Sequence, residues 1–504
     1  AAVAIEDLTP FQRLAGRPLA GGLSLRLQGS ATSDALKIDA TIDGTLNDLE
    51  IGQAELDRLL QGQTTLSAEI GRNGAAFTLP SLAVENPQIT VSGNGTYSPE
   101  RGDVDARIAM SDLSQVVPEL QGPGTVVVKA AGRSGVWDVD LDAEAQDIAV
   151  TANAELSGLD QEVKSIAGEA ELRLADLERF SRLAGRDLGG AVTLTVEGSG
   201  TSDAARADLT FAGTTTSLRI DQPEADRLLA GTTALSGRVI KQGADIRLPE
   251  FQLSNPQITA EAQGSYAGDG SAIQAEVSLP DLGRIRPELS GPGRATVVAE
   301  QVGSIWQVSV DAAGAGATLD AVGEVSDVGR TTPTVTGRAA LAANDLSRFS
   351  RLAGRTIGGS VDVTMNGSAR IDGGVFDLDV DATGQGLQVG QEDADRLLAG
   401  RMQLNASVAR EGADAPITVR RFALQSPAIT ASAQGQVLGG ASNLELSVRL
   451  ADVAPYAEGI SGPVSLSGTV GEAGDALQLN ISGQGPGGTT LRVSGGIARS
   501  FGSA

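Results

Sequence analysis

A seven-residue phrase that recurs at one fixed interval constrains this chain more than any other feature. FSRLAGR is spelled at 180–186 and at 349–355, and a near copy, FQRLAGR, occupies 11–17. Both intervals are 169 residues. Repetition at a fixed period is typical of proteins that stack one structural unit many times. The 504 residues therefore predict three β-repeats, 1–169, 170–338 and 339–504, that form one continuous elongated sheet rather than separate globular domains.

Other landmarks return at the same interval. The phrase LDRLLQG at 56–62 matches ADRLLAG at 225–231 and at 394–400. Trp137 and Trp306, the only tryptophans, are also 169 residues apart. Each stands near the start of an alternating segment, so we expect both to be packing anchors at strand starts.

Between these landmarks, apolar and polar residues alternate with the period of a β-strand. In WDVDLDAEA and FDLDVDA, aliphatic positions alternate with aspartates. Glycine-containing turns separate such segments roughly every 8 to 14 residues, which is typical of an antiparallel meander. The residues expected to line one apolar face, and to contact a guest if the face is open, are Leu23, Leu25, Leu27, Val139, Leu141, Val192, Leu194, Val196, Val361, Val363, Met365, Phe376, Leu378 and Val380.

The repeated phrase itself predicts a short helix. In DLERFSRLAGR, Asp176 can cap the helix start and Gly185 supplies the left-handed residue that ends it. In the first copy, we expect Thr9 to be the cap and Pro10 the first helical residue. A helix this short is unstable alone and is expected to lie on an apolar surface. The residues of this structural helix motif are Phe11, Leu14, Gly16, Phe180, Leu183, Gly185, Phe349, Leu352 and Gly354.

The expected fold is all-β with short helices: an elongated antiparallel sheet that curls into a taco-like groove. A sheet with one apolar face must hide that face from water. It can pack against a second sheet as a dry core, or curl around an apolar ligand. The residues alone leave both alternatives open.

Composition excludes several functional classes. Without histidine or cysteine, the chain has no Ser-His-Asp or Cys-His triad and no Cys/His zinc site. A net charge of −25 argues against binding nucleic acid or an anionic membrane surface. The conspicuous acids either recur, as Asp57, Asp226 and Asp395 do, or alternate outward on strands, whereas a catalytic pair normally occurs once. We therefore expect a protein that is not an enzyme, with no catalytic, cofactor or metal site; Asp226 and Arg227 could form a ligand clamp, but a helix-surface role is favoured.

The many short strands, the unit DLxxFxxLAGRxLGGxVxLxxxG and the glycine-rich, acidic, cysteine-free character resemble the TamB family and, more widely, the AsmA-like proteins. This resemblance covers essentially the whole chain. It implies a hydrophobic groove that spans the periplasm of a Gram-negative bacterium. It further implies phospholipid transport, outer-membrane biogenesis and protein secretion as part of a translocation and assembly module.

The expected partners are phospholipid acyl chains and, through the full-length protein, an outer-membrane TamA-like barrel; we expect no homo-oligomer. The chain has no run of about 20 apolar residues and no basic start followed by an apolar stretch. We therefore expect a piece of a longer protein. The resemblance implies that it is a middle fragment, anchored in the inner membrane through another segment. The alternative function is a structural repeat spacer or surface protein with a dry core and no lipid cargo.

Overall fold

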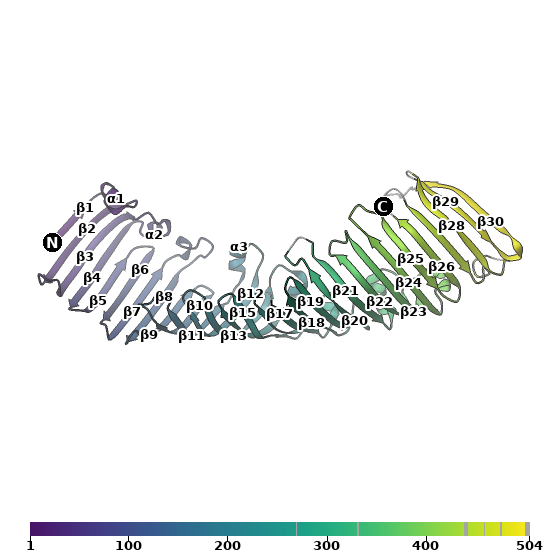
Figure 1. The fold of residues 1–504 in the computed structure, drawn as a ribbon. Coiled ribbons are helices and arrows are strands. Elements are labelled where there is room, and N and C mark those ends of the chain that lie inside the picture. Colours follow the sequence, from purple (N-terminus) through teal and green to yellow (C-terminus); the bar gives the residue numbers. More distant parts are fainter. Residues whose placement is uncertain (269, 330–331, 438–441, 458, 474–475, 499–504) are drawn as a thin grey trace. The chain divides into compact units, whose positions relative to one another are not determined.

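The structure is a computed structural model, and it describes residues 1–504 except 269, 330–331, 438–441, 458, 474–475 and 499–504. It divides into two units, Ala1–Pro256 and Gln257–Ala504. Each unit contains fifteen strands and a few short helical segments (Figure 1).

Unit 1 consists of the first fifteen strands, each hydrogen-bonded to its chain neighbours. Its strands are β1 (Ala2–Ile5), β2 (Ala20–Ala31), β3 (Lys37–Glu50), β4 (Gln63–Asn73), β5 (Ala76–Glu85), β6 (Ile89–Tyr97), β7 (Arg101–Met110), β8 (Gly124–Arg133), β9 (Val136–Ala145), β10 (Ile148–Ser157), β11 (Ser165–Leu174), β12 (Gly189–Thr201), β13 (Arg206–Arg219), β14 (Thr232–Gln242) and β15 (Asp245–Asn255).

Unit 2 repeats this plan with the remaining strands. They are β16 (Ile258–Tyr266), β17 (Ala272–Leu279), β18 (Gly293–Val302), β19 (Ile305–Gly314), β20 (Ala317–Ser326), β21 (Thr334–Ala343), β22 (Gly358–Arg370), β23 (Phe376–Gln388), β24 (Arg401–Arg410), β25 (Ile417–Gln425), β26 (Ile429–Val437), β27 (Asn443–Leu450), β28 (Val464–Ala473), β29 (Ala476–Gln484) and β30 (Thr490–Ala498).

Within each unit, every described strand pair is antiparallel and joins strands that are neighbours in sequence. Fifteen strands at a spacing of about 4.8 Å extend about 70 Å in the hydrogen-bonding direction, whereas a ten-residue strand is about 33 Å long. Each unit is therefore an elongated antiparallel sheet. It curls without closing, and the predicted all-β fold class is confirmed.

The curl has visible causes in glycines and bulges. A Cβ atom on Gly198 would lie 2.0 Å from the carbonyl oxygen of Asp208, and one on Gly367 would lie 2.0 Å from that of Asp377. Only glycine allows the strands to approach so closely, and such positions let a sheet bend. The pairing register also shifts near Gly190, which marks a β-bulge that further twists its strand.

Helical segments occupy the loops at one edge of each sheet, which we call the helix margin (Figure 1). The opposite edge, the hairpin margin, carries mostly short turns between strands. The α-helices are α1 (Gln12–Ala15), α2 (Ala54–Leu59), α3 (Ser181–Ala184), α4 (Pro223–Leu228), α5 (Ser350–Ala353) and α6 (Glu392–Leu397); the 3-10 helices are η1 (Thr9–Phe11), η2 (Leu113–Gln115), η3 (Glu178–Phe180), η4 (Leu282–Arg284), η5 (Leu346–Phe349) and η6 (Pro486–Gly488).

The repeated heptad forms one turn of 3-10 helix followed by one turn of α-helix. Gly16, Gly185 and Gly354 end these segments in the left-handed conformation, with φ of 66°, 67° and 65°, as predicted. The predicted cap of the first copy is wrong. Leu8 occupies the N-cap position and Thr9 is the first helical residue. The amide of Thr9 donates a 2.8 Å hydrogen bond to Asp7, so Asp7 takes the capping role from one residue further out.

The leucines of the heptad also depart from expectation. Leu177 is buried at the start of its segment, but Leu14, Leu183 and Leu352 are 88%, 63% and 55% exposed. These three side chains do not lie on an apolar surface of their own unit. The segments are held in place by caps and by contacts to the backbone, not by packing of each leucine against an apolar surface.

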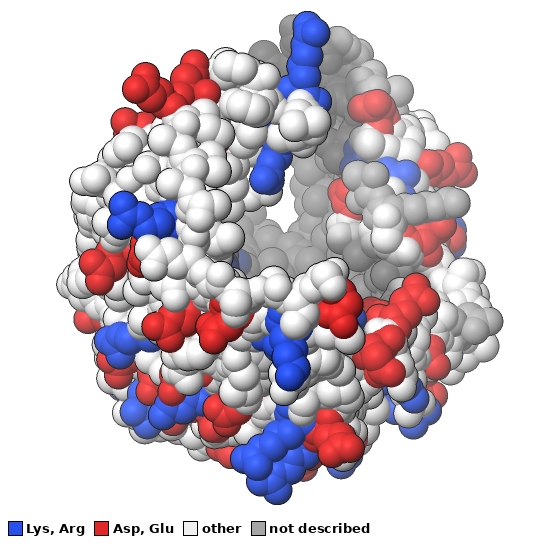
Figure 2. All heavy atoms as spheres, turned by 90° about the vertical axis from the view of Figure 1, so that its left-hand side faces the viewer, with Lys and Arg blue, Asp and Glu red and all other residues white. Residues whose placement is uncertain are grey.

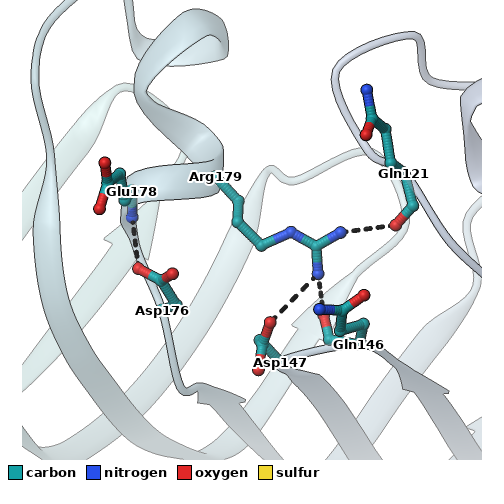
Figure 3. Close-up of polar contacts among 6 residues, drawn as sticks. All are labelled: Gln121, Gln146, Asp147, Asp176, Glu178 and Arg179. Carbon is teal, nitrogen blue, oxygen red and sulfur yellow. Dashed lines mark hydrogen bonds and ion pairs between the residues drawn. The ribbon is translucent and has the colours of Figure 1, made fainter.

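Arg179 provides such a contact at the helix margin (Figure 3). Its guanidinium donates hydrogen bonds to the carbonyl oxygens of Gln121, at 2.5 Å, and Gln146, and it lies 3.4 Å from a carboxylate oxygen of Asp147. Asp176 accepts the amide of Glu178 at 2.9 Å beside it. One side chain thereby joins η3 to the loop after η2 and to the turn between β9 and β10.

Candidate functional site: the apolar face of the sheet

Side chains of directly paired residues in an antiparallel sheet point to the same face, so the register traces rows across the strands. The row through Leu194 crosses fourteen strands of unit 1 without a polar side chain. It consists of Leu25, Gly44, Leu66, Val84, Val91, Ile108, Val126, Ala143, Val150, Leu172, Leu194, Gly213, Leu235 and Leu253.

Unit 2 has the corresponding row through Val363, and it is also wholly apolar. It consists of Ala260, Val277, Ala295, Ala312, Leu319, Leu341, Val363, Ala382, Leu404, Leu424, Ala431, Val448, Leu466, Gly483 and Leu491.

The next two rows toward the hairpin margin continue the surface. Val196 pairs with Ala170 and Phe211, and Met365 pairs with Ala339 and Val380. The rows through Gly198 and Gly367 follow. We call the surface formed by these three rows in each unit the trough.

The other face of the sheet is polar. Glu276, Thr296, Asp311 and Asp320 form one continuous cross-strand row there. Figure 2 looks onto the β1 end of unit 1: acidic and basic side chains gather on the outer surface, whereas the described side chains that border the hollow are mostly uncharged, with a few basic ones among them. The trough therefore lies on the inner side of the curl.

The trough is not a packed core. Among the described residues only nine hydrophobic side chains are buried, whereas Leu341 and Met365, in the middle of the trough, are 41% and 38% exposed. The chain exposes 29518 Å² in total. Two compact proteins of half its mass would together expose about 21,000 Å². Of the alternatives that the sequence left open, a second sheet covering the apolar face therefore finds no counterpart within either unit.

A local hollow of about 270 Å³ lies in the trough of unit 2. Gly323, Gly337 and Gly367 are paired across three strands and remove side-chain volume at its floor. Aliphatic side chains surround this glycine patch: Val308, Val310, Val325, Val335, Met365 and Leu378.

The structure brings together the face that the sequence predicted. Within unit 1, the predicted residues Leu25, Leu141, Val192, Leu194 and Val196 all lie on inward-facing rows, as do Val363 and Val380 within unit 2. The remaining predicted residues take the same face on β2, β9, β22 and β23: Leu23, Leu27, Val139, Val361, Met365, Phe376 and Leu378.

Sequence reasoning missed part of the surface. Phe211 and Phe251 of unit 1, and Phe422 of unit 2, also face the trough. Phe251 and Phe422 lie on β15 and β25, where a register shift breaks the alternation. The regular alternation of the partner strands was the signal that could have located them.

The conspicuous recurrent acids serve the backbone. Asp57, Asp226 and Asp395 each accept one backbone amide six residues earlier, at 2.6, 2.8 and 2.6 Å. Arg227 bonds to Glu224 within its own helix at 3.2 Å. These contacts give the DRLLAG phrase a structural role rather than that of a ligand clamp.

Other carboxylates cap turns. The hydroxyl and amide of Ser114 lower the pKa of Asp112, and the amides of Gly462 and Ala454 lower that of Asp452. Within the described part of the chain, no group of three or more acidic side chains is arranged to hold a metal ion. None of its helices is long and apolar enough to cross a membrane.

Comparison with known proteins adds no assignment: no family model and no curated protein matches the chain. The candidate site therefore rests on its geometry. In each unit that geometry is an inward, uninterrupted, half-exposed aliphatic surface.

Proposed function

We propose that the protein is a non-enzymatic conduit that carries phospholipids along its trough. Acyl chains would lie on the aliphatic rows while headgroups stay in water. The observation that carries the proposal is the row through Leu194, which crosses fourteen strands without a polar side chain and without a covering layer. Removal of acyl chains from water supplies the driving force, at about 0.8 kcal/mol for each buried CH₂ group.

Movement along such a surface requires little change in free energy. Neighbouring strands are about 4.8 Å apart, so each step of that length presents another aliphatic strand to the same lipid. A single deep pocket would instead hold its ligand in one place. A continuous apolar row, on which each position resembles the next, therefore supports movement of a lipid along the sheet rather than its retention at one position.

The wider setting belongs to the same proposal. The resemblance to TamB and the AsmA-like family supports a periplasmic location, an inner-membrane anchor outside this sequence and a role in outer-membrane biogenesis and protein assembly with a TamA-like barrel. The alternative, a spacer with a dry interior, is disfavoured by the half-exposed trough residues.

Photo-crosslinking tests the conduit directly. A benzophenone side chain at Leu194 faces the trough, and the same group at the adjacent Thr193 faces outward, which makes it a matched control. With protein purified from cells that contain phospholipid, we expect at least five-fold more lipid adduct at Leu194. Equal capture at the two positions, or native mass spectra without any copurified phospholipid, would contradict the proposal and favour the spacer.

Charge placement gives a second, independent test. Leu194→Asp combined with Val363→Asp should reduce copurified lipid several-fold, because a carboxylate is costly to bury beside an acyl chain. The control pair, Thr193→Asp with Thr364→Asp, adds the same charge to the polar face and should retain lipid. Circular dichroism checks that both variants remain β-structured.

A further inference from the structure

A margin row follows the trough toward the hairpin margin, and its composition differs from that of the trough. In unit 1 it includes Phe77, Tyr97 and Trp137, linked through the pairings of β5 to β9. In unit 2 Trp306 and Phe376 occupy it, and Tyr266 ends β16 on the same face. Both tryptophans and two of the three tyrosines of the chain therefore lie in this row.

These rings mark a boundary. Tryptophan and tyrosine combine an apolar body with a polar group and favour places where one end is dry and the other wet. The Trp137 ring lies over Gly102 and Gly132, where an added Cβ would come within 2.3 and 2.5 Å of it. Tyr97 and Tyr266 remain 52% and 61% exposed. The margin row is thus where the apolar surface meets water.

The same row carries the inward-facing charges. Among strand residues whose side chains are described, charges otherwise lie on the polar face, but Arg72, Lys241 and Arg410 take inward register positions. They are spaced by the interval of 169 residues, each is half-buried, and all are basic. A chain with 63 acidic and 38 basic residues has therefore placed only positive charge on this described inner surface.

These cations have no acidic partner among the described residues. Arg72 donates to the carbonyl oxygen of Gly74 at 3.0 Å, and its guanidinium lies 5.0 Å from the centre of the Phe77 ring. Arg410 donates to the carbonyl oxygen of Ala415 at 3.1 Å. The ion pairs of described arginines and lysines involve other residues.

We propose that the hairpin margin binds the phosphate of negatively charged phospholipid headgroups at Arg72, Lys241 and Arg410. This inference rests on the proposed conduit and adds selectivity to it. Guanidinium and ammonium groups bind phosphate through charge-assisted hydrogen bonds, which strengthen where water is partly excluded. Two of the three cations also have an aromatic cross-strand partner: Arg72 pairs with Phe77, and Arg410 pairs with Phe376. Lys241 instead pairs with the aliphatic residues Ala207 and Ile246.

Arg72 and Lys241 are too far apart to bind one headgroup together, so each is a separate binding site, which we call a station. Arg72 on β4 and Lys241 on β14 are ten strands apart within unit 1, which is about 48 Å along the sheet. A headgroup bound at one station cannot reach the next, so the phosphate is released between them while the acyl chains stay on the trough.

Lipid capture from mixed vesicles tests this proposal. The purified protein is incubated with vesicles of equal parts phosphatidylglycerol and phosphatidylcholine, separated from them, and its bound lipids are counted by mass spectrometry. The test variant combines Arg72→Gln, Lys241→Gln and Arg410→Gln. Its matched control removes two arginines and one lysine from exposed positions on the polar face: Arg107→Gln, Lys129→Gln and Arg449→Gln.

We expect the natural protein and the control to be enriched in phosphatidylglycerol at least five-fold over phosphatidylcholine, and the test variant to bind both lipids equally. Equal enrichment in test variant and control would overturn headgroup binding while leaving the conduit intact. A natural protein that captures neither lipid would overturn both proposals. Circular dichroism of the test variant separates loss of the cations from loss of the fold.

Discussion

Single carboxylates fix the shape of the loops at the helix margin. Asp112 accepts the amide of Ser114 at 3.1 Å, the hydroxyl of Ser114 at 2.7 Å and the amide of Gly122 at 3.0 Å. One side chain thus holds both ends of the segment around η2. Asp452 repeats the arrangement with the amides of Ala454 and Gly462.

These contacts predict a dependence of stability on pH. Hydrogen bonds from Ser114 lower the pKa of Asp112 below its ordinary 3.8, so the folded state binds its proton more weakly than the unfolded state does. The stabilisation is complete above pH 3.8 and is lost as the pH falls through the lowered folded value. We expect the thermal midpoint to drop by a few degrees over this acidic window, measured by circular dichroism.

Asp112→Asn is the matched variant, because the amide keeps one acceptor oxygen but does not titrate. Its midpoint should be lower at neutral pH and should change less on acidification. A variant as acid-sensitive as the natural protein would rule out Asp112 as a contributor.

At the scale of the element, each short helical segment depends on contacts outside itself. Arg179→Met removes two hydrogen bonds to carbonyl oxygens and the ion pair with Asp147. Because hydrogen bonds from a charged group contribute about 1.5–3 kcal/mol, we expect about 2 kcal/mol of lost local stability. Hydrogen exchange of residues 176–186 should become faster.

Arg182→Met provides the control for this element, since Arg182 is exposed in the next turn and makes no side-chain hydrogen bond in the described structure. Its exchange should match that of the natural protein. Equal acceleration in the two variants would mean that a general loss of positive charge, rather than the contacts of Arg179, loosens the segment.

The sequence predicted the strands and short helices better than it predicted the contacts around them. Strict alternation located β9, β12, β22 and β23 and the face that each presents. It missed Phe251 and Phe422, which lie on β15 and β25, where a register shift breaks the period. The cap was missed at Asp7 because Thr9 is an equally good capping residue and stands next to Pro10. The exposure of the heptad leucines Leu14, Leu183 and Leu352 could not be predicted, because it depends on the path of the loop rather than on the helical period.

The candidate site shows the same division. The aliphatic rows could be predicted because period two is a local property of each strand. The three inward cations could not, because Arg72, Lys241 and Arg410 stand at strand ends, where only the cross-strand register reveals their face. The pairing of Arg410 with Phe376, which lies on the inward face, is what shows that Arg410 also takes an inward position.

At the scale of the molecule, the described strands of each unit pair with their chain neighbours, so instability is expected to remain local. Gly198→Val would force a side chain against the carbonyl oxygen of Asp208. We expect a loss of at least about 2 kcal/mol, because the backbone must move. Hydrogen exchange should accelerate in β11 to β13 and stay unchanged in β4 to β6.

Ala212→Val is the control for this prediction, because Ala212 lies on the exposed polar face of β13, where added volume meets only water. Its exchange pattern should remain that of the natural protein. Acceleration spread evenly over unit 1 in Gly198→Val would show that the sheet unfolds as one cooperative body instead.

Because each strand pairs with its chain neighbours, the length of a unit can change without disturbing the rest of its sheet. Adding or deleting one hairpin within a unit changes its length by about 10 Å, yet preserves the direction of every other strand and the side on which each loop emerges. Duplication of the gene segment that encodes one hairpin could therefore lengthen a unit by two strands. The length of a unit can therefore change without a new fold.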